Sequence, residues 1–297
     1  MKFWARIFAA GFASAALISA AQFGVVYGLG ALRLNRDFAE ADGDWNIQLT
    51  WIAWFILTAV VGGGAYAAGL SRLLTKRLSV GIGVRLVAAS AAGLGAGVAS
   101  LPLTVYPAID AKLGLPVNPA ITVAFTVCAA LAVGIGMSAI IAGNAPMTTN
   151  VAYFTFSIWV LAVVSISEIP PLFGRLYLEQ PRLGVLDIST LEPIPRASFS
   201  MPVLAAAVGI LVAIVGRARR QPRILIALSG TAGPLLAGLA YLLSGPGPQK
   251  LTGQADGYLG AMIAVVVGLT LSTIIALLPR SSRERQVYPT ARSDEFL

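Results

Sequence analysis

The sequence predicts an all-α polytopic membrane protein, a bundle of about eight transmembrane helices with both termini in the cytoplasm. The first observation is composition: 57% of the 297 residues are hydrophobic and only 11% are charged, whereas a soluble domain carries about 25% charged residues. The second is that several apolar runs reach the roughly 20 residues that a helix needs to cross the hydrocarbon core. The third is that the charged residues lie in short clusters between these runs. A soluble fold of this length needs far more polar surface, so the chain is predicted to fold in lipid.

Eight apolar segments satisfy the length requirement. We expect membrane spans at about 8–30, 49–70, 84–106, 120–142, 150–169, 200–216, 224–244 and 258–278. Together they form a single transmembrane domain over residues 1–280, followed by a short basic and polar cytoplasmic tail over 281–297.

The orientation follows from the basic residues, which cluster at every second connection. The clusters are Lys2 and Arg6; Arg72, Lys76, Arg77 and Arg85; Arg217, Arg219, Arg220 and Arg223; and Arg280, Arg283, Arg285 and Arg292. Short cytoplasmic loops retain Lys and Arg, so these connections are expected in the cytoplasm. The extracytoplasmic loops are then about 31–48, 107–119, 170–199 and 245–257. The first of them, RLNRDFAEADGDWN, is acidic, and the cytoplasmic loop GNAPMTTN carries no charge.

The N-terminus has two interpretations. A basic start, an apolar run and the small residues at 19–21 resemble a signal peptide with its cleavage site. The apolar run continues through FGVVYGLGAL, past the point where a signal peptide ends. We therefore expect an uncleaved first span; cleavage would leave seven spans with the same orientation.

Small residues and prolines mark the interior of the spans. Gly24 and Gly28, Gly93 and Gly97, and Gly134 and Ser138 recur at helical spacing, which predicts close helix packing within the bundle or, alternatively, a dimer interface. Pro102 and Pro234 interrupt backbone hydrogen bonding and should kink or end their helices. Broken helices at membrane depth often line transporter sites, so both prolines are candidate functional residues, although proline is also common in membrane helices.

Composition excludes much of enzyme chemistry. The chain has no histidine and one cysteine, Cys128, inside an apolar run. Imidazole ligation of a metal or haem, and Ser-His or Cys-His catalytic pairs, are therefore impossible. The sequence has no P-loop, HExxH or GxSxG motif and no extended basic surface for nucleic acid. We predict no catalytic, cofactor or metal residue, no nucleic-acid partner and no enzymatic activity.

One carboxylate stands out. In SISEIPPLFGR, Glu168 closes an apolar span just before two prolines. It lies at the outer interface if the helix starts near Val151, and deeper if the helix starts near Pro146. Arg175 in the following loop is a candidate partner for this acid. Glu168 and Arg175 are thus further candidate functional residues, against the alternative of a hydrated interfacial acid.

The loop 170–199 is apolar and rich in proline, with balanced charge. It is expected to lie on the outer leaflet, to fold over the bundle as a lid, or to dock other membrane subunits. The spans hold few ionisable groups, which disfavours an ion-driven cycle. We therefore predict a non-enzymatic scaffold or accessory subunit of a membrane complex; the alternative is a carrier or permease for an apolar or lipid-like solute. Seventeen arginines against four lysines suggest a GC-rich genome, so the bacterial inner membrane is the predicted location.

Overall fold

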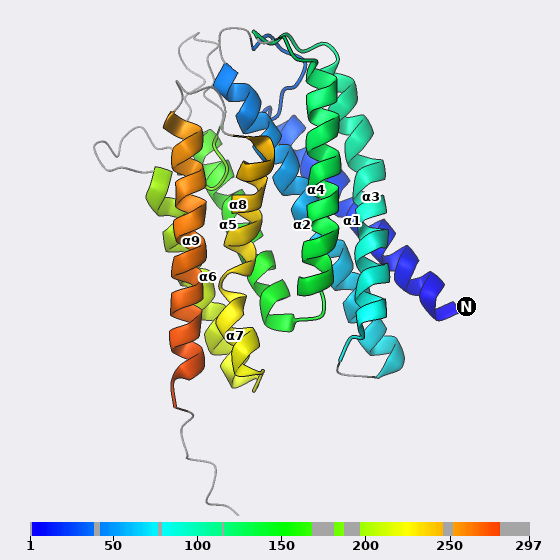
Figure 1. Cartoon of the computed structure of the whole chain (residues 1–297), viewed down its shortest axis with the longest axis vertical. Helices are drawn as coiled ribbons and strands as arrows, with labels where there is room; N and C mark the ends of the chain where they lie inside the picture. The colour runs from blue at the N-terminus through cyan, green and yellow to red at the C-terminus, as the bar shows by residue number, and fades with distance from the viewer. Residues whose placement is uncertain are drawn as a thin grey trace, which may run out of the picture.

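The computed structural model describes residues 2–38, 42–76, 79–114, 116–167, 181–186, 197–245 and 252–279. Within these ranges the chain is all-helical and contains no strand. The helices are α1 (Lys2–Gly28), α2 (Asp42–Thr75), α3 (Ile82–Ala108), α4 (Pro119–Ile141), α5 (Ala145–Ser167), α6 (Ala197–Ala218), α7 (Arg223–Ser229), α8 (Ala232–Ser244) and α9 (Thr252–Leu277). They form one elongated bundle (Figure 1).

Seven of the described helices are long and apolar enough to cross a membrane. The short helices α7 and α8 pass the same test together, although they meet at an angle of 42°, and would make an eighth span. The predicted all-helical bundle is therefore confirmed, with seven or eight segments that are long and apolar enough to span a membrane. Several helices continue beyond the predicted spans; α9, for example, begins at Thr252 rather than near 258, because hydropathy detects only the apolar part of a helix.

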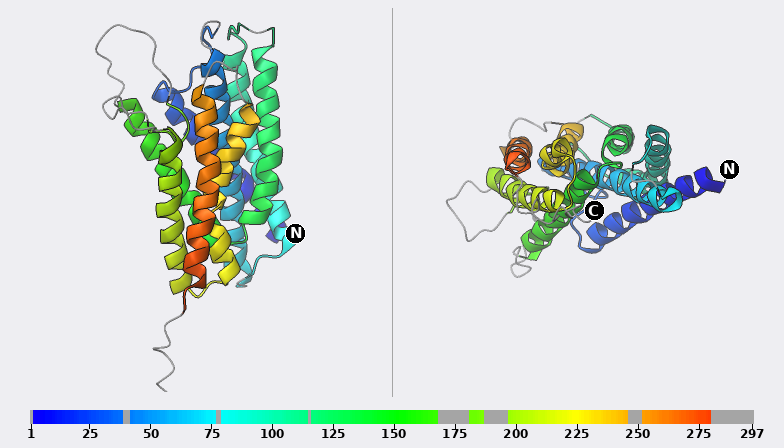
Figure 2. Two further views of the ribbon diagram at one scale, coloured as in Figure 1. Left: turned by 60° about the vertical axis from the view of Figure 1, so that its left-hand side comes forward. Right: turned by 90° about the horizontal axis from the view of Figure 1, so that it is seen from below.

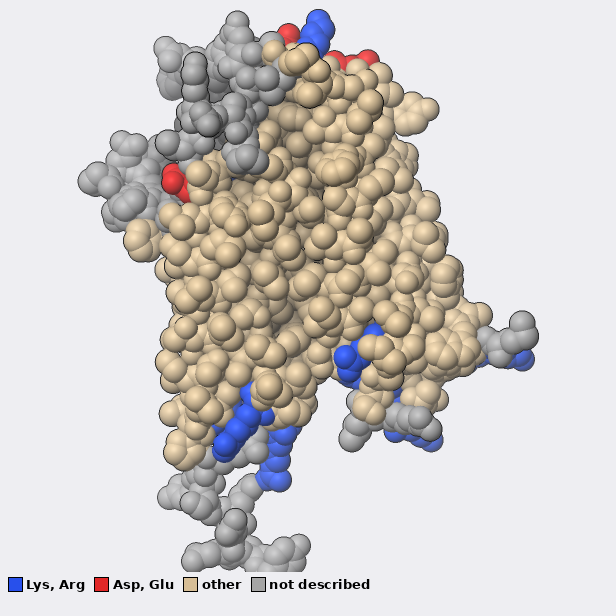
Figure 3. Space-filling model, viewed as in Figure 1, with Lys and Arg blue, Asp and Glu red and all other residues tan. Residues whose placement is uncertain are grey.

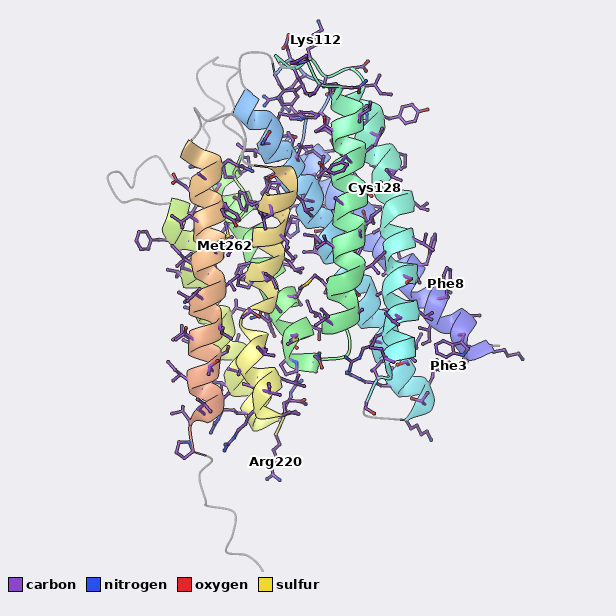
Figure 4. The ribbon with its side chains drawn as sticks, viewed as in Figure 1. Phe3, Phe8, Lys112, Cys128, Arg220 and Met262 are labelled. Atoms are coloured by element: carbon purple, nitrogen blue, oxygen red, sulfur yellow. The ribbon has the colours of Figure 1, made fainter. Side chains whose placement is uncertain are left out.

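The charged side chains separate to the two ends of the bundle (Figure 3). We call the end that carries the α2–α3 and α6–α7 connections the basic end, and the opposite end, with Asp37, Asp44 and Asp110, the acidic end. Arg220 and Lys112 mark the two ends in Figure 4. This separation agrees with the predicted alternation of connections, and the cytoplasmic position of the basic end stays a prediction.

Helix α2 lies at the centre of the bundle and packs against α1, α3, α4, α5 and α8 (Figure 2). Its membrane window is 78% buried, whereas those of the other candidate spans are between 33% and 50% buried. Trp51, Trp54 and Phe55 are buried on α2 and pack in the largest hydrophobic cluster. A helix that is hydrophobic all round is expected in such a central position.

Small residues bring the helices together, as predicted. An added Cβ would collide with Ala15 at Gly63, with Ser138 at Gly64 and with the backbone of Gly268 at Gly230. Gly93, Gly97 and Gly134 also pack inside the bundle. Gly24 and Gly28 differ from the prediction, because no atom outside their own helix lies near enough to meet a Cβ.

The prolines act in different ways. Pro102 does not end α3, which continues through it to Ala108. Pro107 lacks an N–H, so it leaves the carbonyl of Leu103 without its helical partner. That carbonyl accepts a hydrogen bond from the hydroxyl of Tyr27 on α1 (2.7 Å).

The break between α7 and α8 follows from Pro234. A proline ring clashes with the carbonyl four residues earlier, which is Gly230, the residue at which the two helices part. Pro234 itself lies in the first turn of α8, where a missing N–H breaks no helical bond. The side chain of Asn150 on α5 accepts a hydrogen bond from the Gly233 N–H (2.9 Å) and so caps the new helix. The predicted interruption by Pro234 is confirmed, while a functional role for it stays a prediction.

Candidate functional site: a groove between α1, α2 and α5

A groove of about 400 Å³ runs along the flank of the bundle between three helices. Helix α2 forms the centre of the groove, and helices α1 and α5 form its two sides. The lining residues are Ile18 and Gln22 of α1; Thr58, Val61, Gly62 and Ala65 of α2; and Thr148, Val151, Ala152, Thr155 and Trp159 of α5. This surface is mostly apolar and carries no ionisable side chain. Its depth follows from the small side chains at positions 62, 65 and 152.

Two polar side chains meet in the groove. Thr58 Oγ1 lies 3.1 Å from Gln22 Oε1 and 2.8 Å from the carbonyl oxygen of Trp54, one helical turn earlier. Gln22 Nε2 donates to the carbonyl of Phe55 (3.2 Å). Both side chains are buried, with exposed fractions of 8% for Gln22 and 5% for Thr58. Each polar group is therefore partly satisfied within the protein and still borders the groove.

Thr155 of α5 also lines this groove. Its Oγ1 is buried and has no hydrogen-bond partner within the described residues. A buried hydroxyl without a partner costs free energy, and Thr in a membrane helix commonly bonds back to its own helix instead. Thr155 therefore offers an unused donor and acceptor next to the apolar surface.

Trp159 lies furthest along α5 toward the acidic end among the groove residues. Its ring stacks on Phe55 of α2, with the centroids 5.5 Å apart and an angle of 12° between the planes. Aromatic pairs of this kind stabilise by about 0.5–1.5 kcal/mol beyond their buried area. The stacking fixes α5 against α2 at this level.

A second polar cluster lies nearer the acidic end and is buried. Gln254 Nε2 donates to Thr50 Oγ1 (2.7 Å) and lies 3.0 Å from Ser244 Oγ. Thr50 Oγ1 and Ser244 Oγ are 2.7 Å apart. These three buried side chains come from α2, α8 and α9, and together they cross-link the helices. We call them the Thr50 cluster.

Two of the four predicted functional residues, Glu168 and Arg175, lie outside the described residues, so their roles stay predictions. Pro102 and Pro234 are described, but neither lines the groove. The residues that do line it were not predicted as a site. In the sequence, Gln22 is a neutral polar residue within an apolar span, whereas nothing separates Thr58 and Thr155 from other threonines in membrane helices.

The long loop 170–199 is described at 181–186 and from 197 onward. The segment 181–186 packs on the bundle: Pro181 O accepts from Trp51 Nε1 (2.8 Å), and Leu183 O accepts from the hydroxyl of Tyr241 (2.7 Å). The exposed fractions of Leu183 and Val185 are 1% each. This part of the loop therefore folds over the bundle, which was one of the predicted positions; docking of other subunits on the loop stays a prediction.

The polar groups among the groove residues given above are neutral hydroxyls, one amide and the indole N–H of Trp159. Among the described residues there is no group of His, Cys, Asp or Glu that could hold a metal ion. No acid, base or nucleophile with an activating partner faces the groove. No protein-family model, curated protein sequence or solved structure matches the chain, so the fold and the groove are interpreted from their own geometry.

Proposed function

We propose that this protein is a carrier or permease for an apolar or lipid-like solute, and that the solute binds in the groove between α1, α2 and α5. The observation that carries the proposal is an apolar groove on the flank of a membrane bundle, bordered by the Gln22–Thr58 pair and the unpartnered hydroxyl of Thr155. Ligand sites are typically apolar clefts with a few polar groups that fix orientation. An ion or a sugar would need more polar contacts than this surface provides.

The size of the groove supports a chain-like solute rather than a partner helix. Its volume of about 400 Å³ lies at the lower end of the range for small-molecule sites. A helix has a diameter of about 10 Å, so two to three turns of it fill roughly 1,200 Å³. A single hydrocarbon chain therefore fits the space better, and a neutral lipid without a phosphate would place an ester or hydroxyl oxygen near Thr58 or Thr155.

The scaffold hypothesis keeps one supporting observation. Gly62, Ala65 and Ala152 are small residues on the groove surface, and small residues favour close approach of a second membrane helix. A partner subunit would then occupy part of the groove. The absence of catalytic groups facing the groove fits both functions, and the location in a bacterial inner membrane is part of this proposal.

The test is to fill the groove. Ala152→Phe places a ring in the groove, and Val160→Phe, at an exposed position on another face of α5 (45% exposed), is the matched control. Purified variants in micelles are incubated with a neutral diazirine-bearing diacylglycerol, irradiated and mapped by mass spectrometry. We expect Ala152→Phe to lower labelling of the α1 and α5 peptides about tenfold, because overpacking costs on the order of 1–3 kcal/mol. Val160→Phe should leave the labelling unchanged.

Equal labelling of the wild type and a folded Ala152→Phe variant would contradict the proposal. Copurification of a membrane subunit that is lost in Ala152→Phe, without specific labelling of the wild type by the diacylglycerol, would instead support the scaffold hypothesis.

A further inference from the structure

At the basic end of the bundle, the side chains of two arginines contact the same glycine. Arg72, in the last turn of α2, donates from Nη2 to the carbonyl of Gly143 in the α4–α5 turn (2.6 Å). Arg85, in the first turn of α3, donates from Nε to the carbonyl of Val80 (3.1 Å). A Cβ added at Gly143 would collide with the guanidinium of Arg85. Both guanidinium groups therefore contact the same residue.

This pair has no counter-ion in the part of the chain that the structure describes. The ion pair Arg36–Asp44 lies at the acidic end, and every described Asp side chain lies in a connection or helix start at that end. On the face in view, Figure 3 shows blue atoms and no red atoms at the basic end. Two like charges held together repel each other, and the repulsion weakens when an anion binds between them.

Each guanidinium of the pair keeps unused N–H donors for a phosphate. A guanidinium carries five N–H donors in a rigid plane, and each of these two groups uses one of them on a backbone carbonyl. Arg72 Nε is buried and has no hydrogen-bond partner among the described residues. Planar paired donors of this kind bind phosphate oxygens in a bidentate manner, which a lysine cannot do.

Arg217 at the same end shows what a purely structural arginine does here. Its Nη1 lies 2.8 Å from the carbonyl of Ile275 and 2.7 Å from that of Leu278, and its Nη2 donates to the carbonyl of Pro279 (3.0 Å). It thereby caps the C-terminus of α9, where cations are favoured. Arg72 and Arg85 each bond to a single carbonyl, so capping leaves most of their donors unused.

The arginine pair lies at the end of the groove surface. Thr58, Ala65 and Arg72 recur every seven residues on α2, so they lie on one face of this helix, with Arg72 about 21 Å below Thr58. Between Ala65 and Arg72, Gly69 faces open space. On the other side of the groove, Thr148 lies one turn into α5, and its N–H donates to the carbonyl of Asn144 beside Gly143 (3.0 Å). Both α2 and α5 thus lead from the groove to the pair.

We propose that Arg72 and Arg85 bind the phosphate of an anionic membrane lipid whose hydrocarbon chain occupies the groove. The inference rests on the proposed function, which it sharpens from a lipid-like solute to a phospholipid-like amphiphile. The phosphate binds at the basic end, the chain passes over Gly69 and Ala65, and the lipid approaches sideways from the bilayer.

The experiment measures thermal unfolding of the full chain in micelles with added lipid or salt. Phosphatidylglycerol is the anionic lipid, phosphatidylcholine is the zwitterionic lipid, and inorganic phosphate is the free anion. A ligand that binds only the folded state raises the midpoint temperature in a concentration-dependent way. The wild type should be protected by phosphatidylglycerol at concentrations about tenfold lower than by either other additive.

The variant is Arg72→Gln with Arg85→Gln, and the matched control is Arg219→Gln with Arg223→Gln. Both doubles remove two positive charges from the basic end, and Arg219 and Arg223 are exposed. The Arg72→Gln, Arg85→Gln variant should lose the preference for phosphatidylglycerol, and the control variant should keep it. If the preference came from a general attraction to anionic surfaces, both variants would lose it to the same extent. Equal losses, or protection of the wild type by inorganic phosphate as strong as that by phosphatidylglycerol, would overturn the assignment.

Labelling by the neutral diacylglycerol separates this proposal from the function on which it rests. We expect the Arg72→Gln, Arg85→Gln variant to keep this labelling, since the chain contacts are intact. Loss of groove labelling in Ala152→Phe together with an unchanged lipid preference in the arginine variant would overturn the phosphate site alone. No groove labelling in the wild type would overturn both.

Discussion

Helix α2 carries two threonines, Thr50 and Thr58, that have similar local structure and different surroundings. Each hydroxyl lies 2.8 Å from the carbonyl four residues earlier. Thr50 is enclosed by Ser244 and Gln254 from two other helices. Thr58 has one side-chain partner, Gln22, and borders the groove next to the unpartnered hydroxyl of Thr155.

The difference shows how a polar group in a membrane helix takes its role from its neighbours. In the Thr50 cluster each hydroxyl and amide group has a partner on another helix, so the cluster acts as a cross-link between helices. Beside Thr58, the hydroxyl of Thr155 has no hydrogen-bond partner among the described residues. Satisfied networks rigidify a core, whereas incompletely satisfied groups leave capacity for a ligand.

The largest expected effect is all-or-none labelling of introduced cysteines. It reports on which side of the membrane each connection lies. In a Cys128→Ser background, cysteines at Asp110 and Lys112 should react with an impermeant maleimide in whole cells, because both positions are exposed at the acidic end. Cysteines at Thr75, Ala218 and Ser293 should not react, because the basic connections stay inside. Labelling at Ala218 in intact cells would reverse the orientation and place the arginine pair on the outer side.

A smaller effect is expected when the Thr50 cluster is broken. Gln254→Leu removes the amide that joins α9 to Thr50 and Ser244. The free energy of unfolding, measured by titration with sodium dodecyl sulfate, should fall by about 1 kcal/mol, as for interhelical hydrogen bonds in other membrane proteins. Met262→Leu on the same helix should change it little. Labelling of the groove by the diacylglycerol should be the same in all three proteins; a loss in Gln254→Leu would show that the two clusters are coupled.

The smallest effect on stability is expected at Thr58. Thr58→Val keeps the side-chain shape, and Gln22 retains its bond to the carbonyl of Phe55, so the free energy of unfolding should change by less than about 0.5 kcal/mol. Labelling by the diacylglycerol should fall about threefold, because one net hydrogen bond is lost. Thr270→Val, at an exposed threonine that bonds only to its own helix, is the control. A large loss of stability with unchanged labelling would make Thr58 a structural residue like Thr50.

The position of the Thr50 cluster illustrates a limit of prediction from the sequence. Gln254 was expected in the loop 245–257 because it lies outside the apolar run, yet it is helical and only 6% exposed. Hydropathy records the preference of a residue for lipid, and a glutamine has none. The partners that make its burial favourable come from α2 and α8, about 200 and 10 residues away along the chain.

The sequence by itself determined the helical class, the approximate spans, the separation of charge between the two ends and the interruption of the helix before Pro234. These features depend on local properties: apolar length, clusters of Lys and Arg, and the clash of a proline ring with the carbonyl four residues earlier. Only the tertiary structure decided that α1 and α5 stand apart on α2 to leave a groove, and that Arg72 and Arg85 meet on Gly143. Lipid tails solvate every apolar helix face about equally well, so hydropathy does not determine which helix faces pack together. That choice depends on the fit of particular side chains, such as Ala15 against Gly63 and Trp159 against Phe55, and the fit exists only once the helices are packed.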